Sequence, residues 1–586
     1  MINHRKNFVL LETLRKDKDN SQNLLFTDPL DIIVCTSPDD IQACFRKMER
    51  YRQKGCFLAG FFSYELGYFL EDTLTPFCPR YNYPLFWFGV YKQPVQPAHP
   101  ESKSSDMRFY LSEPILDIRY PSYERAIHKI KKRIACGETY QINYTSRYHF
   151  NVIGNVSDFY NQLKTAQQVS YSALINHDGH VIVSLSPELF FRIDAKQNIT
   201  VKPMKGTAPL DTPASWLQND AKNLSENVMI VDLLRNDLGR ICLSGSVKVK
   251  KLFDVEKYET LQQMTSTVTG KLKTETSIGD LISSLFPCGS VTGAPKIQSM
   301  KIIAGIEKSP RNVYTGAIGY FAPDGQAVFN VAIRTIDMQR QHEGIYRAQM
   351  GVGGGIVYDS RPEEEFAECR LKADFLQNSK ADFALIETMP ALNGKIPNLG
   401  PHLRRLKASA DYFSVPCPTG KIKERLKTCA EKWPAGVRLR LLVQSNGEIL
   451  LENAPLPAPA QGEPVIAISP VRTQSPDPFL RHKTTRRKQY DDGYRQYAAR
   501  GFFDVIFLNE KEQVTEGAIS NIFIQVRGRW YTPPVSCGLL NGIQRQILIK
   551  KWKATEKILS LQDLKKADQI VLTNAVRGIT SVRLYP

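Results

Sequence analysis

Residues 226–241 read ENVMIVDLLRNDLGRI, and this stretch sets the architecture expected for the first half of the chain. Apolar residues at helical spacing predict a helix over 222–238, with Gly239 as its C-cap: Leu224, Val228, Val231, Leu234 and Leu238. Glu226 and Asp237 lie eleven residues apart, about three turns, so both carboxylates share one helix face. A polar stripe exposed to solvent is the alternative explanation of that face.

Strand-forming runs occur in both halves of the chain. Apolar and β-branched runs bounded by turn residues predict strands at 180–186, 198–204, 247–255, 436–444, 504–509, 521–526 and 569–574. Helical and strand patterns thus occur along the same chain. We therefore expect a mixed architecture, either α/β or α+β.

The composition is that of a globular protein with several cores. At about 100–200 residues per domain, 586 residues predict three or four units, and 42% apolar residues are enough to build them. The net charge of +18 fits nucleic acid, an anionic membrane surface or small anionic substrates, so charge alone does not decide among them. Eleven scattered cysteines without CxxC pairs predict reduced thiols rather than a disulfide framework or a zinc site.

No targeting or membrane segment is expected. The most apolar stretch, 55–70, is interrupted by Glu65 and is shorter than the roughly 20 residues of a spanning helix. The first apolar run, within 1–20, is too short for a secretory signal. We expect a cytoplasmic protein.

Breaks in the pattern predict the domain boundaries. The loop 92–113 is rich in Pro, Ser and charge, and a second break lies at 377–382. A third, at 451–465, carries four prolines and predicts an extended linker between two subdomains. The expected regions are an N-terminal part, a catalytic domain, a linker and a C-terminal domain: 1–114, 115–376, 377–382 and 383–586.

Several polar motifs mark a candidate site in the first half: CGETYQINYTSR (136–147), SLSPELFFR (184–192), PMKGTAPL (203–210) and DSRPEEEFAECR (359–370). In the last motif Pro362 is expected to start a helix, so that Glu365 and Glu368 project together and can hold a hard cation such as Mg²⁺. Acidic residues in a first turn also complement the helix dipole without any function. GVGGGI (351–356) reads as a glycine-rich turn or as an anion-binding nest.

With FPCGSVTGAPK (286–296), RNVYTGAIGYF (311–321) and FNVAIRT (329–335), these motifs resemble the chorismate-utilising enzymes over roughly 115–376. The resemblance implies an α+β fold in which packed β-sheets are flanked by helices. It further implies Mg²⁺ on Glu226 and Glu365, with Glu368 acting through water. It also implies that Glu188 is the general acid that helps the ring hydroxyl to leave. The residues implied in substrate binding are Tyr314, Arg334, Gly351, Gly353, Gly354 and Thr207.

Two positions separate branches of this family. Gln141 stands where members that add water carry a lysine base, so the resemblance implies ammonia as the nucleophile. The sequence PMKGT, in place of PIAGT, is typical of aminodeoxychorismate synthase component I, in which Lys205 would be a covalent nucleophile. That role requires a partly desolvated or cation-flanked amine. Members of the family take ammonia from a glutamine amidotransferase partner, and free ammonia is the alternative source.

The second half carries another set of motifs: FALIETM (383–389), HLRRLKASADYF (402–413), PFLRHKTTRRKQY (478–490), VTEGAISNIFI (514–524), GLLNGIQRQIL (538–548) and VLTNAVRGI (571–579). The run RHKTTRRK could be a nucleic-acid patch, but it lacks interleaved aromatic residues. A pyridoxal phosphate enzyme needs an imine-forming lysine, an acid facing the pyridine nitrogen and an anion site for the phosphate. All three can be nominated here.

The order of these motifs resembles the fold-type IV pyridoxal phosphate enzymes, which include branched-chain aminotransferases and 4-amino-4-deoxychorismate lyases. The resemblance implies a two-subdomain fold, Lys483 as the Schiff-base lysine and Glu516 at the pyridine nitrogen. The implied phosphate ligands are Arg405, the amide of Ile543, and Thr573 with Asn574 at an expected helix start. The usual opening strands are missing before FALIETM, and a homodimer through this domain is compatible with the family.

Together the two resemblances imply synthesis of 4-aminobenzoate: amination of chorismate, then elimination of pyruvate. The alternatives are a component I-like anthranilate synthase fused to a transaminase, or a basic nucleic-acid-binding protein. Lys205 argues against the first alternative. An enzyme that makes 4-aminobenzoate acts on small molecules, so we expect neither nucleic acid nor a membrane among the partners.

Overall fold

The computed structural model describes residues 6–15, 23–97, 109–209, 212–257, 261–342, 344–377, 383–433, 436–458 and 462–585, except for the side chains at 207–209, 214, 221–222, 257 and 261. The described chain divides near residue 380 into two units. Among the described residues, no helix combines the length and hydropathy that crossing a bilayer requires.

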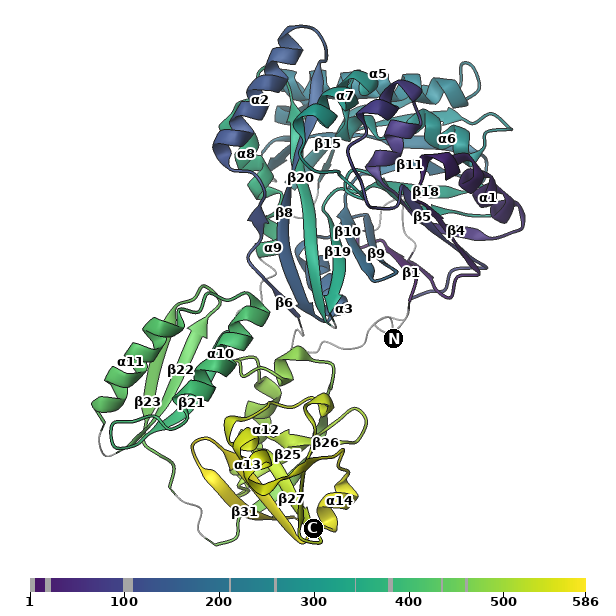
Figure 1. Cartoon of the computed structure of the whole chain (residues 1–586). Helices are drawn as coiled ribbons and strands as arrows, with labels where there is room; N and C mark the ends of the chain where they lie inside the picture. Colours follow the sequence, from purple (N-terminus) through teal and green to yellow (C-terminus); the bar gives the residue numbers. More distant parts are fainter. Residues whose placement is uncertain are drawn as a thin grey trace. The chain divides into compact units, whose positions relative to one another are not determined.

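Two large sheets form the first unit (Figure 1). The strand order of the first sheet is β16 (Gly293–Ala294), β8 (Gln141–Gly154), β20 (Ile345–Ile356), β19 (Thr335–His342), β10 (His180–Ser186), β9 (Tyr171–His177), β1 (Phe8–Glu12) and β2 (Leu24–Phe26). That of the second is β13 (Met204–Pro209), β15 (Leu261–Lys271), β12 (Asn198–Lys202), β11 (Leu189–Ile193), β18 (Ala327–Val331), β17 (Ala317–Phe321), β4 (Phe57–Phe62), β5 (Phe86–Tyr91) and β3 (Asp31–Cys35), with β14 (Lys248–Lys257) beside β15.

The core of this unit has two layers because successive strand residues point to opposite faces. Phe61 of β4 joins a buried cluster with Trp87 and Ile175 that draws residues from both sheets. Its neighbour Phe62 joins a second cluster, which the second sheet shares with three helices: α1 (Ile41–Gln53), α5 (Ala221–Ile241) and α6 (Ile278–Leu285). On the first sheet, α2 (Tyr120–Ala135) and α8 (Pro362–Leu371) pack on β20.

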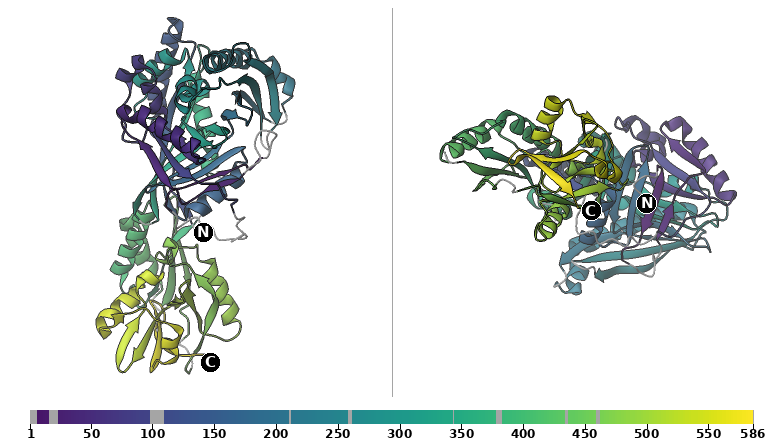
Figure 2. Two further views of the ribbon diagram at one scale, coloured as in Figure 1. Left: turned by 90° about the vertical axis from the view of Figure 1, so that its right-hand side faces the viewer. Right: turned by 90° about the horizontal axis from the view of Figure 1, so that it is seen from below.

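The second unit has two lobes, which Figures 1 and 2 show in green and in yellow-green to yellow. In the first lobe a sheet of β21 (Ala384–Ala391), β22 (Val437–Gln444) and β23 (Ile449–Ala454) lies beside α10 (Leu399–Phe413) and α11 (Thr419–Glu431). In the second, the strand order is β26 (Val514–Gly517), β25 (Asp504–Asn509), β24 (Val465–Thr473), β31 (Gly578–Leu584), β30 (Gln569–Asn574), β27 (Asn521–Val526), β28 (Arg529–Thr532) and β29 (Thr555–Glu556). Its helices include α12 (Lys488–Ala498) and α13 (Ile543–Trp552).

The predicted α+β architecture is confirmed, but five local predictions are wrong. Helix α5 continues past Gly239 to Ile241, and the predicted apolar stripe is broken by Val228, which is 42% exposed. The expected linker 451–465 begins inside β23, because residues 451–454 pair with β22.

The other two errors concern expected anion sites. The glycine run 351–356 is not a turn but the end of β20, between β8 and β19. Thr573 and Asn574 do not start a helix: they end β30 and lead through a turn into β31. The Asn574 side chain accepts hydrogen bonds from the amides of Val576 and Arg577, which closes a hairpin instead.

Candidate functional sites

A buried hydrogen-bonded chain joins two of the predicted catalytic residues in the first unit. Ser290 is 6% exposed, and its hydroxyl donates to Glu188 Oε1 at 2.7 Å. Its carbonyl accepts from Lys205 Nζ at 3.4 Å. Burial raises the pKa of Glu188 above its ordinary value, although the Ser290 hydrogen bond and the Lys205 charge act in the opposite direction. A raised pKa is the direction that a general acid requires.

Gln141 lies next to this pair, at the start of β8. A Cβ at Gly355 would come within 1.9 Å of Gln141 Nε2 and 3.4 Å of Lys205 Nζ. Because glycine has no Cβ, both side chains can approach strand β20 at this position. Gln141 is 1% exposed, and its Nε2 donates to Glu226 Oε2 at 3.5 Å. Its Oε1 is buried without a partner among the described residues. An orphaned buried acceptor of this kind is available to a ligand.

Two of the four carboxylates of α8, those of Glu365 and Glu368, meet at the adjacent glycine, Gly354. A Cβ there would lie 3.2 Å from Glu365 Oε2 and 3.9 Å from Glu368 Oε1. Helix α8 begins at Pro362, which confirms the predicted helix start. Glu365 accepts a hydrogen bond from Ser360 at 2.7 Å, and Glu368 pairs with Lys372 at 2.6 Å.

The oxygen-only donors of Glu226, Glu365 and Glu368 fit Mg²⁺, which needs few carboxylates because it keeps several waters. The described residues hold no group of three His, Cys, Asp or Glu side chains already gathered around one point. Lys372 also donates to the Gly353 carbonyl at 2.7 Å, so an ammonium group stands beside these acids. The magnesium assignment therefore stays a prediction.

The predicted substrate-binding residues lie around the same strand. A Cβ at Gly351 would come within 2.1 Å of the Tyr314 ring, and one at Gly353 within 2.2 Å of the Tyr144 carbonyl, so both glycines are needed for close packing. Arg334 follows β18 with a φ of +49°, and its guanidinium donates to Gln167. The backbone of Thr207 pairs with Gln263, but its side chain lies outside the described part of the structure.

The second unit contains a cavity of ≈ 700 Å³ lined by all of its predicted cofactor residues: Arg405, Lys483, Glu516, Ile543, Thr573 and Asn574. Burial, Arg487 and Arg405 lower the pKa of Lys483 to about 7. Burial raises the pKa of Glu516 to about 7. Glu516 accepts hydrogen bonds from the Leu540 amide at 3.1 Å and from Asn521 at 3.0 Å, which fix the carboxyl in place.

Three features of this cavity fit pyridoxal phosphate. Lys483 supplies an amine that is partly neutral near pH 7, and Glu516 supplies an acid for the pyridine nitrogen. The first amides of α13 begin at Ile543, where a helix N-terminus favours a phosphate. Gly542 must remain bare there, because a Cβ would come within 2.1 Å of Asn521 Oδ1.

A buried ion network holds the predicted phosphate ligand Arg405. Its Nε and Nη2 donate to the two oxygens of Glu387 at 2.8 and 2.7 Å, and His402 Nδ1 lies 2.6 Å from Glu387. Burial acts to raise the pKa of Glu387, but the Arg405 charge and the hydrogen bonds from His402 and Arg405 overcome it and hold the pKa at about 2. Sequence reasoning missed this carboxylate, although it is the E of the quoted FALIETM motif.

This network predicts acid-sensitive stability. The folded pKa of Glu387, about 2, lies below the ordinary 4.5, so its stabilising contribution is complete above about pH 4.5 and is lost as the pH falls toward 2. We expect Glu387→Gln to lower the Tm of the second unit by about 10 °C at pH 6 and by clearly less at pH 3, measured by calorimetry.

Asp411→Asn is the matched control, because Asp411 forms an exposed ion pair with Lys407 on the same helix. It should shift the Tm by no more than about 2 °C. A Glu387→Gln deficit that is equally large at pH 6 and pH 3 would contradict the assignment.

Two family profiles match the chain. That of the chorismate binding enzymes matches residues 6–378, and that of the class IV amino-transferases matches residues 384–585. Both resemblances drawn from the motifs are thereby confirmed.

Similar proteins include aminodeoxychorismate synthases from two bacteria. The aminodeoxychorismate synthase of Streptomyces pristinaespiralis is 41% identical over 273 residues, which cover 44% of this chain and 37% of that protein. Aminodeoxychorismate synthase component 1 of Escherichia coli (strain K12) is 37% identical over 253 residues, 42% of this chain and 54% of that protein. The chain thus spans about half of the relatives' length or less.

A solved structure supports the fold of the first unit. Anthranilate synthase component I from Streptococcus pneumoniae TIGR4 is 25% identical with a TM-score of 0.52, over 61% of this chain and 92% of that chain. Since one profile covers 6–378 of the 586 residues, the chain belongs to the chorismate binding enzymes, and a class IV amino-transferase region follows in the same polypeptide.

Proposed function

We propose that the first unit aminates chorismate to 4-amino-4-deoxychorismate and that the second removes pyruvate from this product to give 4-aminobenzoate. The observation that carries the proposal is the buried chain from Lys205 through Ser290 to Glu188. This chain links the proposed nucleophile and the proposed general acid through one residue, which supports an acid-assisted displacement of a hydroxyl group.

In the first unit Glu188 gives its proton to the ring hydroxyl, which leaves as water while the Lys205 amine forms a carbon–nitrogen bond. The Glu188 carboxylate takes up the proton that the new ammonium group releases. Ammonia then displaces the lysine amine, which leaves with the proton that Glu188 returns to it, and the new ammonium group gives a proton back to Glu188. Gln141 Oε1, which is buried without a partner among the described residues, would accept a hydrogen bond from the ammonia. Mg²⁺ on Glu226, Glu365 and Glu368 would neutralise the ring carboxylate.

In the second unit pyridoxal phosphate would act as an electron sink. Glu516 would hold the pyridine nitrogen protonated, while Arg405, Ile543 and the Thr573–Asn574 segment would bind the phosphate. The Lys483 amine, with its pKa near 7, can take a proton from the carbon that bears the amino group and return one to the departing pyruvate carbon. Ammonia would come from a glutamine amidotransferase partner or from solution.

One assay tests both halves. We expect protein incubated with chorismate, ammonium, Mg²⁺ and pyridoxal phosphate to release 4-aminobenzoate and pyruvate in equal amounts, measured by liquid chromatography. Anthranilate as the aromatic product would instead favour the anthranilate synthase alternative. No turnover by a preparation that binds chorismate would refute the proposal.

A further inference from the structure

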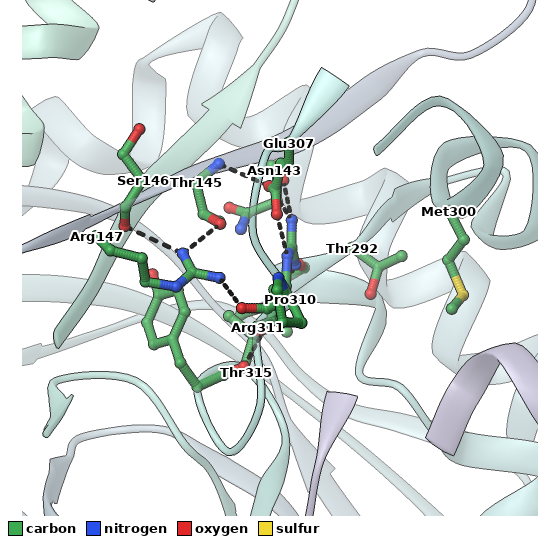
Figure 3. Close-up of polar contacts among 12 residues, drawn as sticks. Asn143, Thr145, Ser146, Arg147, Thr292, Met300, Glu307, Pro310, Arg311 and Thr315 are labelled. Atoms are coloured by element: carbon green, nitrogen blue, oxygen red, sulfur yellow. Dashed lines mark hydrogen bonds and ion pairs between the residues drawn. The ribbon is translucent and has the colours of Figure 1, made fainter. Parts of the chain in front are cut away.

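Arg147 is a buried cation without an ion pair among the described residues. Its side chain leaves β8 and is 3% exposed. Nη1 donates to Thr145 Oγ1 at 2.9 Å and to the Ser146 carbonyl at 3.1 Å, while Nη2 donates to the Pro310 carbonyl at 3.2 Å (Figure 3). Burying a charge without a counter-charge is unfavourable, so packing alone does not favour this arrangement.

The neighbouring Arg311 differs from Arg147 because it has an ion pair. Arg311 is 2% exposed, but its Nε and Nη2 donate to Glu307 at 3.0 and 2.7 Å (Figure 3). Glu65 accepts the amides of Arg311 and Asn312 at 2.6 and 2.9 Å. Glu307 is therefore engaged by Arg311. Glu65 is held by neutral amides, and its charge acts on Arg147 without a direct ion pair, so the guanidinium charge of Arg147 is only partly balanced.

That charge lies over the Tyr314 ring. The guanidinium carbon of Arg147 is 5.2 Å from the ring centroid, within the range of a cation–π contact. The Tyr314 ring also packs directly on the backbone of β20, where Gly351 has no Cβ to block it. Tyr314 is 7% exposed, and its hydroxyl has no hydrogen-bond partner among the described residues, so the hydroxyl is available to a ligand.

We propose that Arg147 is a positioning residue for substrate binding: it fixes the Tyr314 ring against β20 and places a positive charge behind the phenol, so that the hydroxyl donates to a substrate carboxylate. The inference rests on the proposed function of the first unit and on the substrate-binding role that the family resemblance implies for Tyr314. An anionic substrate adds negative charge near a guanidinium that has no direct ion pair among the described residues.

The test is a double-mutant cycle of Arg147→Met and Tyr314→Phe in the full chain. Each single variant should raise the dissociation constant of chorismate about tenfold, with kcat changed by less than about threefold. In the Tyr314→Phe background, Arg147→Met should add less than a further twofold, because Arg147 acts through the hydroxyl that is already gone. Isothermal titration gives the affinities and steady-state kinetics gives kcat.

A matched control is Lys301→Met, which removes a cation 5.4 Å from the Phe77 ring away from this site and should leave chorismate affinity unchanged. If Arg147→Met does not fold, Arg147→Lys, which keeps the charge but loses the planar fork, should weaken binding about threefold, again only when Tyr314 is present.

The outcomes separate the two hypotheses. Unchanged affinity in Tyr314→Phe would remove the substrate role of Tyr314 and the Arg147 proposal with it. Tyr314→Phe could weaken chorismate binding while the double variant weakens it by the product of the two single effects, about a hundredfold. That result would overturn the Arg147 proposal alone. Arg147 variants that lower the Tm without changing affinity would also overturn it.

Discussion

Lys205→Ala is expected to slow ammonia-dependent consumption of chorismate about a thousandfold or more while chorismate still binds. The amine is the proposed nucleophile, and its removal leaves ammonia to attack without the covalent step. Glu188 and Gln141 remain in place in this variant, so the loss should fall on kcat. Product formation followed by liquid chromatography gives the rate, and titration calorimetry gives the affinity.

Lys250→Ala is the control for this experiment, since Lys250 is an exposed lysine of β14 in the same sheet. It should match the unmodified protein. In the absence of ammonia, the unmodified protein should accumulate a Lys205 adduct with the mass of chorismate less one water. Turnover of Lys205→Ala within tenfold of the parent, or loss of chorismate binding, would exclude the nucleophile role.

The second large effect concerns Lys483. We expect Lys483→Ala to bind pyridoxal phosphate without the visible absorbance that the cofactor gains on bonding to a lysine amine, and to release no pyruvate from 4-amino-4-deoxychorismate. Lys511→Ala, which alters an exposed lysine of the turn between β25 and β26, should keep both properties. Retention of the visible band in Lys483→Ala would show that another lysine bonds the cofactor.

The same lysine gives a pH signature. Because burial and the two arginines lower the pKa of Lys483 to about 7, the neutral amine is already abundant at neutral pH. The rate of cofactor attachment should therefore rise through about pH 7 and level off above pH 8, as recorded by stopped-flow absorbance. A rate that keeps rising toward pH 10 would indicate a lysine with ordinary solvation.

Much of the fold could be predicted where the local pattern and the tertiary environment agree. The predicted strands 180–186, 504–509, 521–526 and 569–574 coincide with β10, β25, β27 and β30. The prediction failed where contacts between segments distant in sequence determine the local structure. Glycines at 351–355 are typical of a turn, but the run lies in β20, since neighbouring side chains and carbonyls occupy the space that Cβ atoms would need.

The residues of the candidate sites also fall into a group that the sequence predicted and a group that it did not. Motifs nominated Glu188, Lys205, Lys483 and Glu516, because each carries its own chemistry. The residues that connect them were missed, since hydrogen bonds between distant segments have no signature in a single sequence. Ser290 lies 102 positions from Glu188, in a segment noted only for its motif, yet it touches both proposed catalytic groups of the first unit.

The network around Arg405 also bears on how tightly the second unit can hold a phosphate. Two of its guanidinium nitrogens are already held by Glu387, and Nη1 reaches the Asn541 carbonyl at 3.4 Å at the edge of the cavity. The side chain has therefore given up its rotamer freedom during folding. A phosphate that arrives there meets a guanidinium already held in place, so the entropy of ordering a long side chain, about 0.5–1.5 kcal/mol, is not subtracted from its affinity.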